Sequence, residues 1–297
     1  MKGTVRIGVT LVLTGLAVAY LVWKVDLDAT IETLKDTDLR WFGLSIAIMT
    51  LTAMPMALRW QWLLAARGMI DSFWWLTRAY FVSYTASQIL PTAIVLLERG
   101  LGGAATVLLG AIGFLLAIGR YDTGAYIWLE LMFVVGTILI GVLFFSQRVR
   151  PLLARAAPLL ARLKLERPLR AFYDGVHAFR AHPRLLAKAF SLTFTLQAIR
   201  ILSIWACAKA VGIDLSPLVY YVMGPLFFLV LLVPFTLNGF AVREAFFVSF
   251  LGQVGVSADA AFSAGFLFFL VTVAMALPGG VILLWEGLRR RPDPTHA

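Results

Sequence analysis

The sequence has little charge and very few cysteine or histidine residues. Of its 297 residues, only 14% are charged and 61% are hydrophobic, whereas a soluble domain is about one quarter charged and about half apolar. A water-soluble globule is excluded, because the chain cannot cover the surface of such a globule with polar groups. The same composition excludes a disordered chain. We therefore expect an all-α polytopic membrane protein.

The shortage of ligand residues excludes several kinds of site. The one cysteine, Cys207, lies in an apolar run, so neither a disulfide framework nor a thiolate metal cluster is expected. The three histidines, His177, His182 and His296, lack the spacing of a zinc site. No loop is long enough to form a catalytic domain. We predict no cofactor, no metal, no catalytic residue and no enzyme activity.

What the chain does have is an excess of basic residues, with a net charge of +10. These residues lie in short loops beside apolar runs, which is the pattern of membrane proteins with positive loops on the cytoplasmic side. Attraction to anionic lipid is a second consequence of this pattern. Nucleic acid is therefore not an expected partner.

Apolar runs of about 20 residues predict membrane-spanning helices. The first run could instead be a signal peptide, but it has no small-x-small cleavage site, and we interpret it as an uncleaved span. About six full spans are predicted, at residues 5–23, 41–65, 95–118, 124–145, 185–210 and 260–285.

Loop charges orient these spans. Lys2 and Arg6 put the N-terminus inside, and five acidic residues put 24–40 outside. Nine basic residues in 147–184 and the arginines at 289–291 are inside. We expect a multi-pass protein of the cell (inner) membrane with both termini cytoplasmic. Three arginines that flank the second crossing place residues 66–72 inside as well; they are Arg59, Arg67 and Arg78.

Two further apolar segments do not fit simple crossings. The loops 66–72 and 147–184 are both inside, and spans 95–118 and 124–145 together cross the membrane out and back. Residues 73–94 must therefore enter and return on the inner side, with a break at Pro91. Residues 217–254 must start and finish outside, with a break at 234–239. Interrupted segments at corresponding places in two halves are typical of inverted-repeat transporters. The alternative is two ordinary crossings that cancel in parity.

The predicted organisation is a single transmembrane domain, 1–297. Its first half, 1–146, contains the re-entrant segment 73–94, and its second half, 185–297, contains the broken hairpin 217–254. The linker 147–184 has leucines at helical spacing opposite arginines. It predicts amphipathic helices on the inner leaflet, or a cytosolic cap over the bundle.

Charged residues within apolar segments are the candidates for function, because inserting each one at the centre of a membrane span costs roughly 2.5–3.5 kcal/mol. Arg200 lies near the middle of span 185–210, and Arg243 and Glu244 follow the break in 217–254. Asn238 and Gly239 suit the N-cap of the next helix. The N-terminus of that helix would present free N–H groups to a phosphate. The structural alternative for each arginine is an ion pair that serves packing.

A secondary set of polar residues lies near the same segments. Some of them could instead be ordinary charged residues at the membrane–water interface. The carboxylates are plausible partners for buried arginines. Together with the residues above, they suit an anionic headgroup. This set is Arg78, Gln88, Glu98, Arg99 and Glu130.

Four motifs follow one another along nearly the whole chain. The first three are Arg59-Trp60-Gln61-Trp62-Leu63-Leu64, Gln88-Ile89-Leu90-Pro91 and Leu96-Leu97-Glu98-Arg99-Gly100-Leu101-Gly102. The fourth and most specific is glycine-x-x-x-arginine-glutamate at 239–244. In this order they resemble the lysylphosphatidylglycerol synthase transmembrane (flippase-like) family. The family's usual Gly-Gly-Asp-x-x-Arg stretch is absent after Ile94, and so is a soluble synthase domain.

The resemblance implies movement of an anionic lipid or lipid-linked intermediate between leaflets. Two alternatives remain open: a non-catalytic partner of a separate lipid-synthesising enzyme, and a glycosyltransferase that uses polyprenol phosphate sugars. The second is favoured only by Asp26-Leu27-Asp28, which is similar to a metal-binding acidic pair. The expected partners are membrane lipids, with a lipid-synthesising enzyme or a second copy of the chain also compatible.

Overall fold

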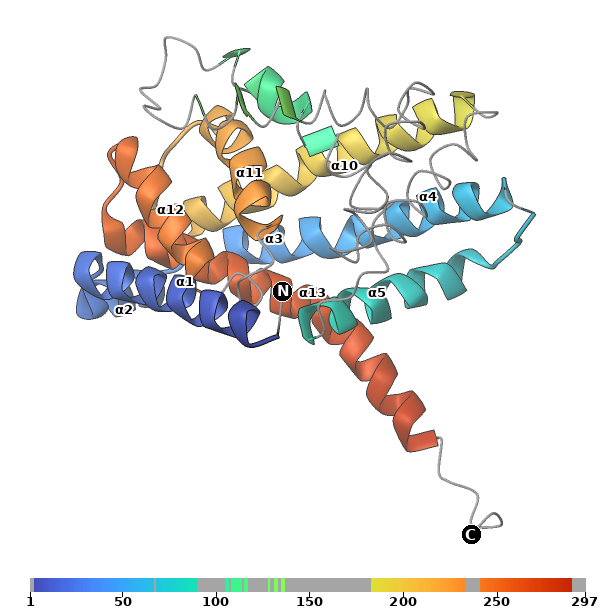
Figure 1. The fold of residues 1–297 in the computed structure, drawn as a ribbon, viewed down its shortest axis with the longest axis horizontal. Helices are drawn as coiled ribbons and strands as arrows, with labels where there is room; N and C mark the ends of the chain where they lie inside the picture. Colours follow the sequence, from blue (N-terminus) through green and yellow to red (C-terminus); the bar gives the residue numbers. More distant parts are fainter. Residues whose placement is uncertain are drawn as a thin grey trace.

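Long apolar helices run side by side through the bundle in Figure 1. The computed structural model describes residues 3–66, 68–89, 105–106, 108–113, 115–116, 128, 131–132, 135–136, 183–232 and 241–289. The helices bounded within this part of the chain are α1 (Gly3–Lys24), α2 (Leu27–Lys35), α3 (Leu39–Leu51), α4 (Ala53–Ala65), α5 (Phe73–Ile89), α10 (Pro183–Ala210), α11 (Pro217–Leu232), α12 (Val242–Gln253) and α13 (Ala258–Arg289).

Three helical segments are long and apolar enough to cross a membrane, at Leu39–Ala65, Pro183–Ala210 and Ala258–Glu286. They match the spans predicted at 41–65, 185–210 and 260–285, and α1 matches the helix predicted at 5–23. At 1.5 Å per residue each of the three exceeds a hydrocarbon core about 30 Å thick. The prediction of a helical membrane protein is confirmed. The spans predicted at 95–118 and 124–145 are described only in part, and the described residues within them are helical. The linker 147–184 lies outside the described residues except for its last two residues.

Segment Leu39–Ala65 pairs with α10 through polar contacts that recur every seven residues. Because seven residues make two helical turns, the contacts lie on one face, about 10 Å apart. Hydrogen bonds between helices are worth roughly 0.6 kcal/mol each in a membrane, so the ladder fixes the register of the pair. Its three rungs are Ser45 with Ser203 and Cys207, Thr52 with Arg200, and Arg59 with Thr193.

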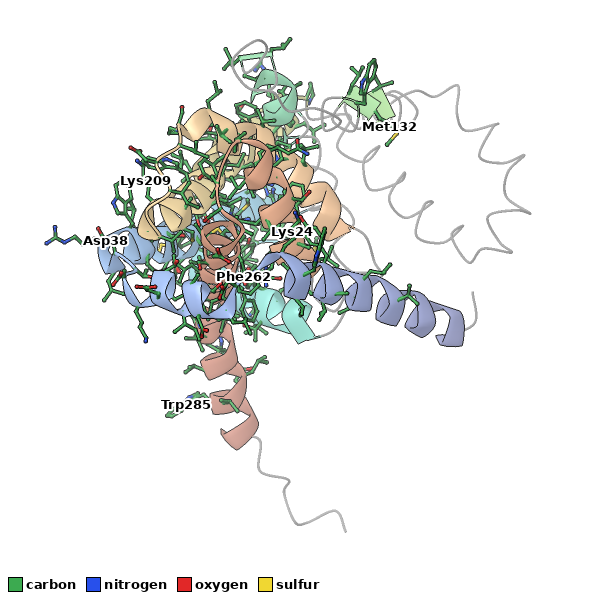
Figure 2. The ribbon with its side chains drawn as sticks, turned by 90° about the vertical axis from the view of Figure 1, so that its left-hand side faces the viewer. Lys24, Asp38, Met132, Lys209, Phe262 and Trp285 are labelled. Atoms are coloured by element: carbon green, nitrogen blue, oxygen red, sulfur yellow. The ribbon has the colours of Figure 1, made fainter. Side chains whose placement is uncertain are left out.

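The loops predicted to face outside meet at one end of the bundle, which Figure 2 views. The Asp38 amide donates to the Ala210 carbonyl at 2.8 Å, and the Asp26 amide donates to Asp259 Oδ1 at 2.7 Å. At the same end, a hydrogen bond from Lys209 holds the pKa of the exposed Asp214 below its usual range. Which end faces the cytoplasm stays a prediction.

Residues 24–40 were expected to be a loop, and this expectation is wrong in part. They contain the nine-residue helix α2. Asp26 is its N-cap, since Asp26 Oδ1 accepts from the amides of Asp28 and Ala29 at 2.9 and 3.3 Å. The Asp-x-Asp pattern that suggested a metal pair is therefore a helix start.

The cap gives a test of this correction. Replacing Asp26 with alanine is expected to lower the free energy of unfolding by about 1 kcal/mol, because two helix N–H groups lose their acceptor. Hydrogen exchange of the α2 amides should speed up by a matching factor. The control Glu32→Ala, on the exposed face of α2, should stay within about 0.5 kcal/mol of the wild type. Equal effects of both variants would contradict the cap.

The segment predicted as a broken hairpin, 217–254, contains two short helices, α11 and α12. Helix α11 is about 24 Å long and α12 about 18 Å, and they pack through Phe227 against Phe246 and Phe247. A cavity of about 310 Å³ between α1 and the end of α12 is lined by Lys24 and Gln253. The predicted break, 234–239, lies outside the described residues.

Helix α5 is one continuous helix of 17 residues, about 25 Å long. Thr85 Oγ1 donates to the Ala276 carbonyl of α13 at 2.6 Å, and Gly279 lets the two backbones approach closely at this crossing. The break predicted at Pro91 lies outside the described residues. An inverted repeat of α5 with the 217–254 hairpin therefore stays a prediction.

Candidate functional site

Three charged residues are almost fully buried in the part of the chain that the structure describes. Their exposed fractions are 1% for Arg59, 4% for Arg243 and 3% for Glu244. Buried charges are retained only where a partner or a function offsets the loss of hydration. Two of the three were predicted as site residues from the sequence.

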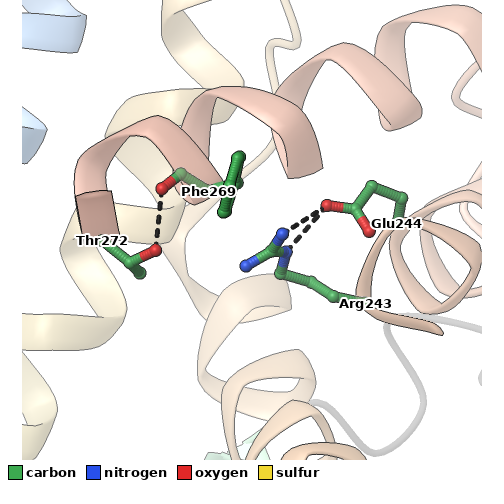
Figure 3. A network of polar contacts seen from close by, with 4 residues as sticks. All are labelled: Arg243, Glu244, Phe269 and Thr272. Atoms are coloured by element: carbon green, nitrogen blue, oxygen red, sulfur yellow. Dashed lines mark hydrogen bonds and ion pairs between the residues drawn. The ribbon is translucent and has the colours of Figure 1, made fainter. Parts of the chain in front are cut away.

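Arg243 and Glu244 form a buried ion pair at the start of α12 (Figure 3). Arg243 Nε and Nη2 both donate to the same oxygen, Glu244 Oε1, at 2.9 and 2.6 Å. The guanidinium carbon lies 4.7 Å from the centroid of the Phe269 ring. Adjacent helix residues rarely face one another, and here the pair meets in the first turn. The guanidinium is thus held by one carboxylate oxygen and one ring.

The start of α12 differs from the prediction. Asn238 and Gly239 were expected to cap this helix, but the N-cap is Ala241, whose carbonyl accepts the first helical bond from the Ala245 amide at 2.8 Å. Ala241 has φ 63°, a region that non-glycine residues rarely adopt. Its methyl group offers no capping oxygen, so the first helix N–H groups gain no side-chain acceptor from their N-cap.

Arg200 binds two neutral hydroxyl groups on other helices. Its Nε donates to Thr52 Oγ1 and its Nη2 donates to the Tyr80 hydroxyl, each at 3.0 Å. Arg243 faces Phe269 of α13, and α13 packs against α5 and α10 as well as against α12. The two predicted arginines therefore lie on helices that pack against the same helix. We call Tyr80, Arg200, Arg243 and Glu244 the arginine cluster.

Arg59 was not predicted to be buried, because its position beside a loop suggested an arginine at the membrane interface. Arg59 Nη1 donates to Thr193 Oγ1 at 2.9 Å within the α4–α10 contact. The available signal was its distance of seven residues from Thr52, which repeats the polar spacing on the same face. Arg59 belongs to the helix ladder and not to the arginine cluster.

Arg78 was a predicted secondary site residue, and the structure places it elsewhere. It forms an ion pair with Glu286 near the C-terminal end of α13, and the two side chains are 47% and 41% exposed. An exposed pair of this kind is worth about 0–1 kcal/mol. Arg78 thus links α5 to α13 at the surface and is not among the buried charges of the described residues.

The other predicted site residues cannot be placed in this cluster. The backbone of Gln88 belongs to α5, but its side chain is outside the described residues, and so are Glu98, Arg99, Glu130, Asn238 and Gly239. The described residues contain no group of three or more potential metal ligands. A guanidinium in a low-dielectric setting is chemically suited to hold a phosphate through two parallel hydrogen bonds.

The apolar helices, the short hairpin and the buried arginines define a polytopic helical membrane protein with a charged internal site. The chain belongs to the family described as Lysylphosphatidylglycerol synthase TM region, whose model matches residues 5–95 and 92–280. The predicted family is confirmed. The two matched segments meet at 92–95, next to the place where the usual glycine-rich stretch is absent.

The family membership supports a function related to membrane lipids. No curated protein matches the chain, and no solved structure matches it. The finer function rests on the chemistry of the site itself.

Proposed function

We propose that this protein moves an anionic lipid, or a lipid-linked intermediate, between the two leaflets of the cell membrane. The observation that carries the proposal is Arg243, a 4% exposed arginine at the inner start of a short hairpin helix. Holding such a charge in a membrane costs a few kcal/mol, which Glu244 offsets in this structure and a bound phosphate would offset in its place. In this proposal the chain makes and breaks no covalent bond.

The headgroup phosphate would bind Arg243 and the first N–H groups of α12, with Arg200 as a second cation nearby. A helix N-terminus and an arginine fork both favour anions with several oxygens. The acyl chains would stay in the bilayer. Movement of the 217–254 hairpin against the 73–94 segment would open the site to one leaflet and then the other, with Glu98 and Glu244 as pairing carboxylates.

The glycosyltransferase alternative gains no support from the described residues. Asp26, which it needs as a metal ligand, caps α2 through Oδ1. The partner role beside a separate lipid synthase is compatible with the proposed transport, because a synthase delivers its product to one leaflet.

The test is leaflet exchange in reconstituted vesicles. Phosphatidylcholine vesicles would carry the protein and a trace of fluorescent phosphatidylglycerol, and a membrane-impermeant quencher would report how fast the inner label becomes accessible. The wild type should accelerate exchange over protein-free vesicles. The double variant Arg243→Gln/Glu244→Gln, which removes the cation without leaving an unpaired charge, should lose about tenfold or more of that rate.

The matched control is Arg40→Gln, a cation on the exposed face of α3, which should exchange lipid like the wild type. Circular dichroism and gel filtration would verify that each variant is folded. Wild-type exchange at the protein-free rate would contradict the proposal. Unchanged exchange in the folded double variant would remove Arg243 from it.

A further inference from the structure

Glu244 pairs with Arg243 through only one of its two carboxylate oxygens. Both hydrogen bonds from Arg243 go to Glu244 Oε1. Glu244 Oε2 is buried and has no hydrogen-bond partner among the residues that the structure describes. A buried acceptor without a donor is destabilising, and more so when it is charged. Glu244 Oε2 is therefore a site for a proton or another donor.

An anionic headgroup and Glu244 compete for the same guanidinium. A phosphate that binds Arg243 through Nε and Nη2 must displace Glu244 Oε1, because both of these donors are already directed at that oxygen. A carboxylate released in this way would be a buried, unpaired charge, which is strongly destabilising. Uptake of one proton removes the charge and turns the carboxyl group into a donor. Headgroup binding and protonation thus favour one another.

We infer that Glu244 takes up one proton whenever Arg243 transfers from Glu244 to a lipid phosphate, so that lipid and proton bind together. The inference rests on the proposed function. The proton comes from the water on the side to which the site is open. It leaves to the opposite side when the lipid departs and Arg243 returns to Glu244. Lipid and proton then move in the same direction, and a pH gradient drives the lipid toward the more alkaline side.

The surroundings offer Glu244 few competitors for this proton. On α13, the described acidic residues are Asp259 and Glu286, at the two ends of the helix. Helix α11 contributes only the phenols of Tyr220 and Tyr221, and phenols ordinarily titrate near pH 10. Within the described residues, Glu244 is the only carboxylate below 9% exposure. Neighbouring elements also carry Tyr20 and Lys24 on α1, Tyr80 and Tyr84 on α5, and Arg200 on α10.

The experiment counts protons during lipid binding. The full chain in detergent would be titrated calorimetrically with short-chain phosphatidylglycerol, whose phosphodiester stays ionised over the range used. Two buffers of different ionisation enthalpy, at several values between about pH 5 and about pH 9, give the number of protons taken up. The wild type should take up about one proton for each lipid that it binds.

Two variants separate the proton site from the lipid site. Glu244→Gln, which keeps an acceptor for Arg243, should bind the lipid with no proton uptake and no pH dependence. Glu244→Asp, which keeps the carboxyl group, should retain proton uptake. Uptake that is unchanged in Glu244→Gln, or absent from a wild type whose lipid binding needs Arg243, would overturn the inference and leave the proposed function standing. A wild type that does not bind the lipid through Arg243 would overturn both.

Discussion

Replacing either member of the buried pair with leucine is expected to lower the free energy of unfolding by about 3–5 kcal/mol. In Glu244→Leu the Arg243 guanidinium loses its carboxylate and keeps the Phe269 ring. In Arg243→Leu the carboxylate is left with two unpaired oxygens. The double variant Arg243→Leu/Glu244→Leu should be clearly more stable than either single one, because no unpaired charge remains. Unfolding in mixed detergent micelles, followed by circular dichroism, measures all three.

The exposed pair Arg78–Glu286 is the matched control for this cycle. Its side chains are 47% and 41% exposed, so water replaces the lost partner. Arg78→Gln and Glu286→Gln should each change the free energy of unfolding by no more than about 1 kcal/mol. Equal changes in the free energy of unfolding for the two pairs would show that Arg243 and Glu244 are not buried in the folded protein.

The substitution Gly279→Ala, which adds one methyl group, is expected to lower the free energy of unfolding by about 1–3 kcal/mol. A Cβ there would collide with the Phe81 carbonyl oxygen and with Thr85 Oγ1. Backbone atoms cannot rotate away as a side chain can, so α5 and α13 must separate. That separation would weaken the 2.6 Å hydrogen bond from Thr85 to the Ala276 carbonyl. The same micelle unfolding experiment reports the loss.

The neighbouring glycine gives the control for this prediction. A Cβ at Gly280 would meet only the Thr85 Cγ2 methyl, at 3.9 Å, which is ordinary van der Waals contact. Gly280→Ala should therefore be neutral or slightly stabilising, because alanine favours a helix over glycine. A neutral Gly279→Ala would show that α5 and α13 do not cross as closely as described.

The candidate site was only partly accessible from the sequence. Arg200 and Arg243 stood out because a charge in an apolar run is expensive whatever surrounds it. The helix N-cap was assigned to Asn238 and Gly239 because these residue types suit it, but the N-cap is Ala241, whose positive φ is unusual for alanine. Arg59 was missed because its burial depends on α10, which lies more than 120 residues further along the chain.

The sequence alone determined that this is a helical membrane protein, where the described spans run and which family it belongs to. Partition between water and lipid depends on the composition of each segment by itself. Only the tertiary structure decided that Arg243 turns back to Glu244, that Arg59 faces Thr193, and that Arg78 lies at the surface with Glu286. The reason is that a charged side chain adopts the partner that helix packing brings within reach, and packing depends on residues distant in the chain.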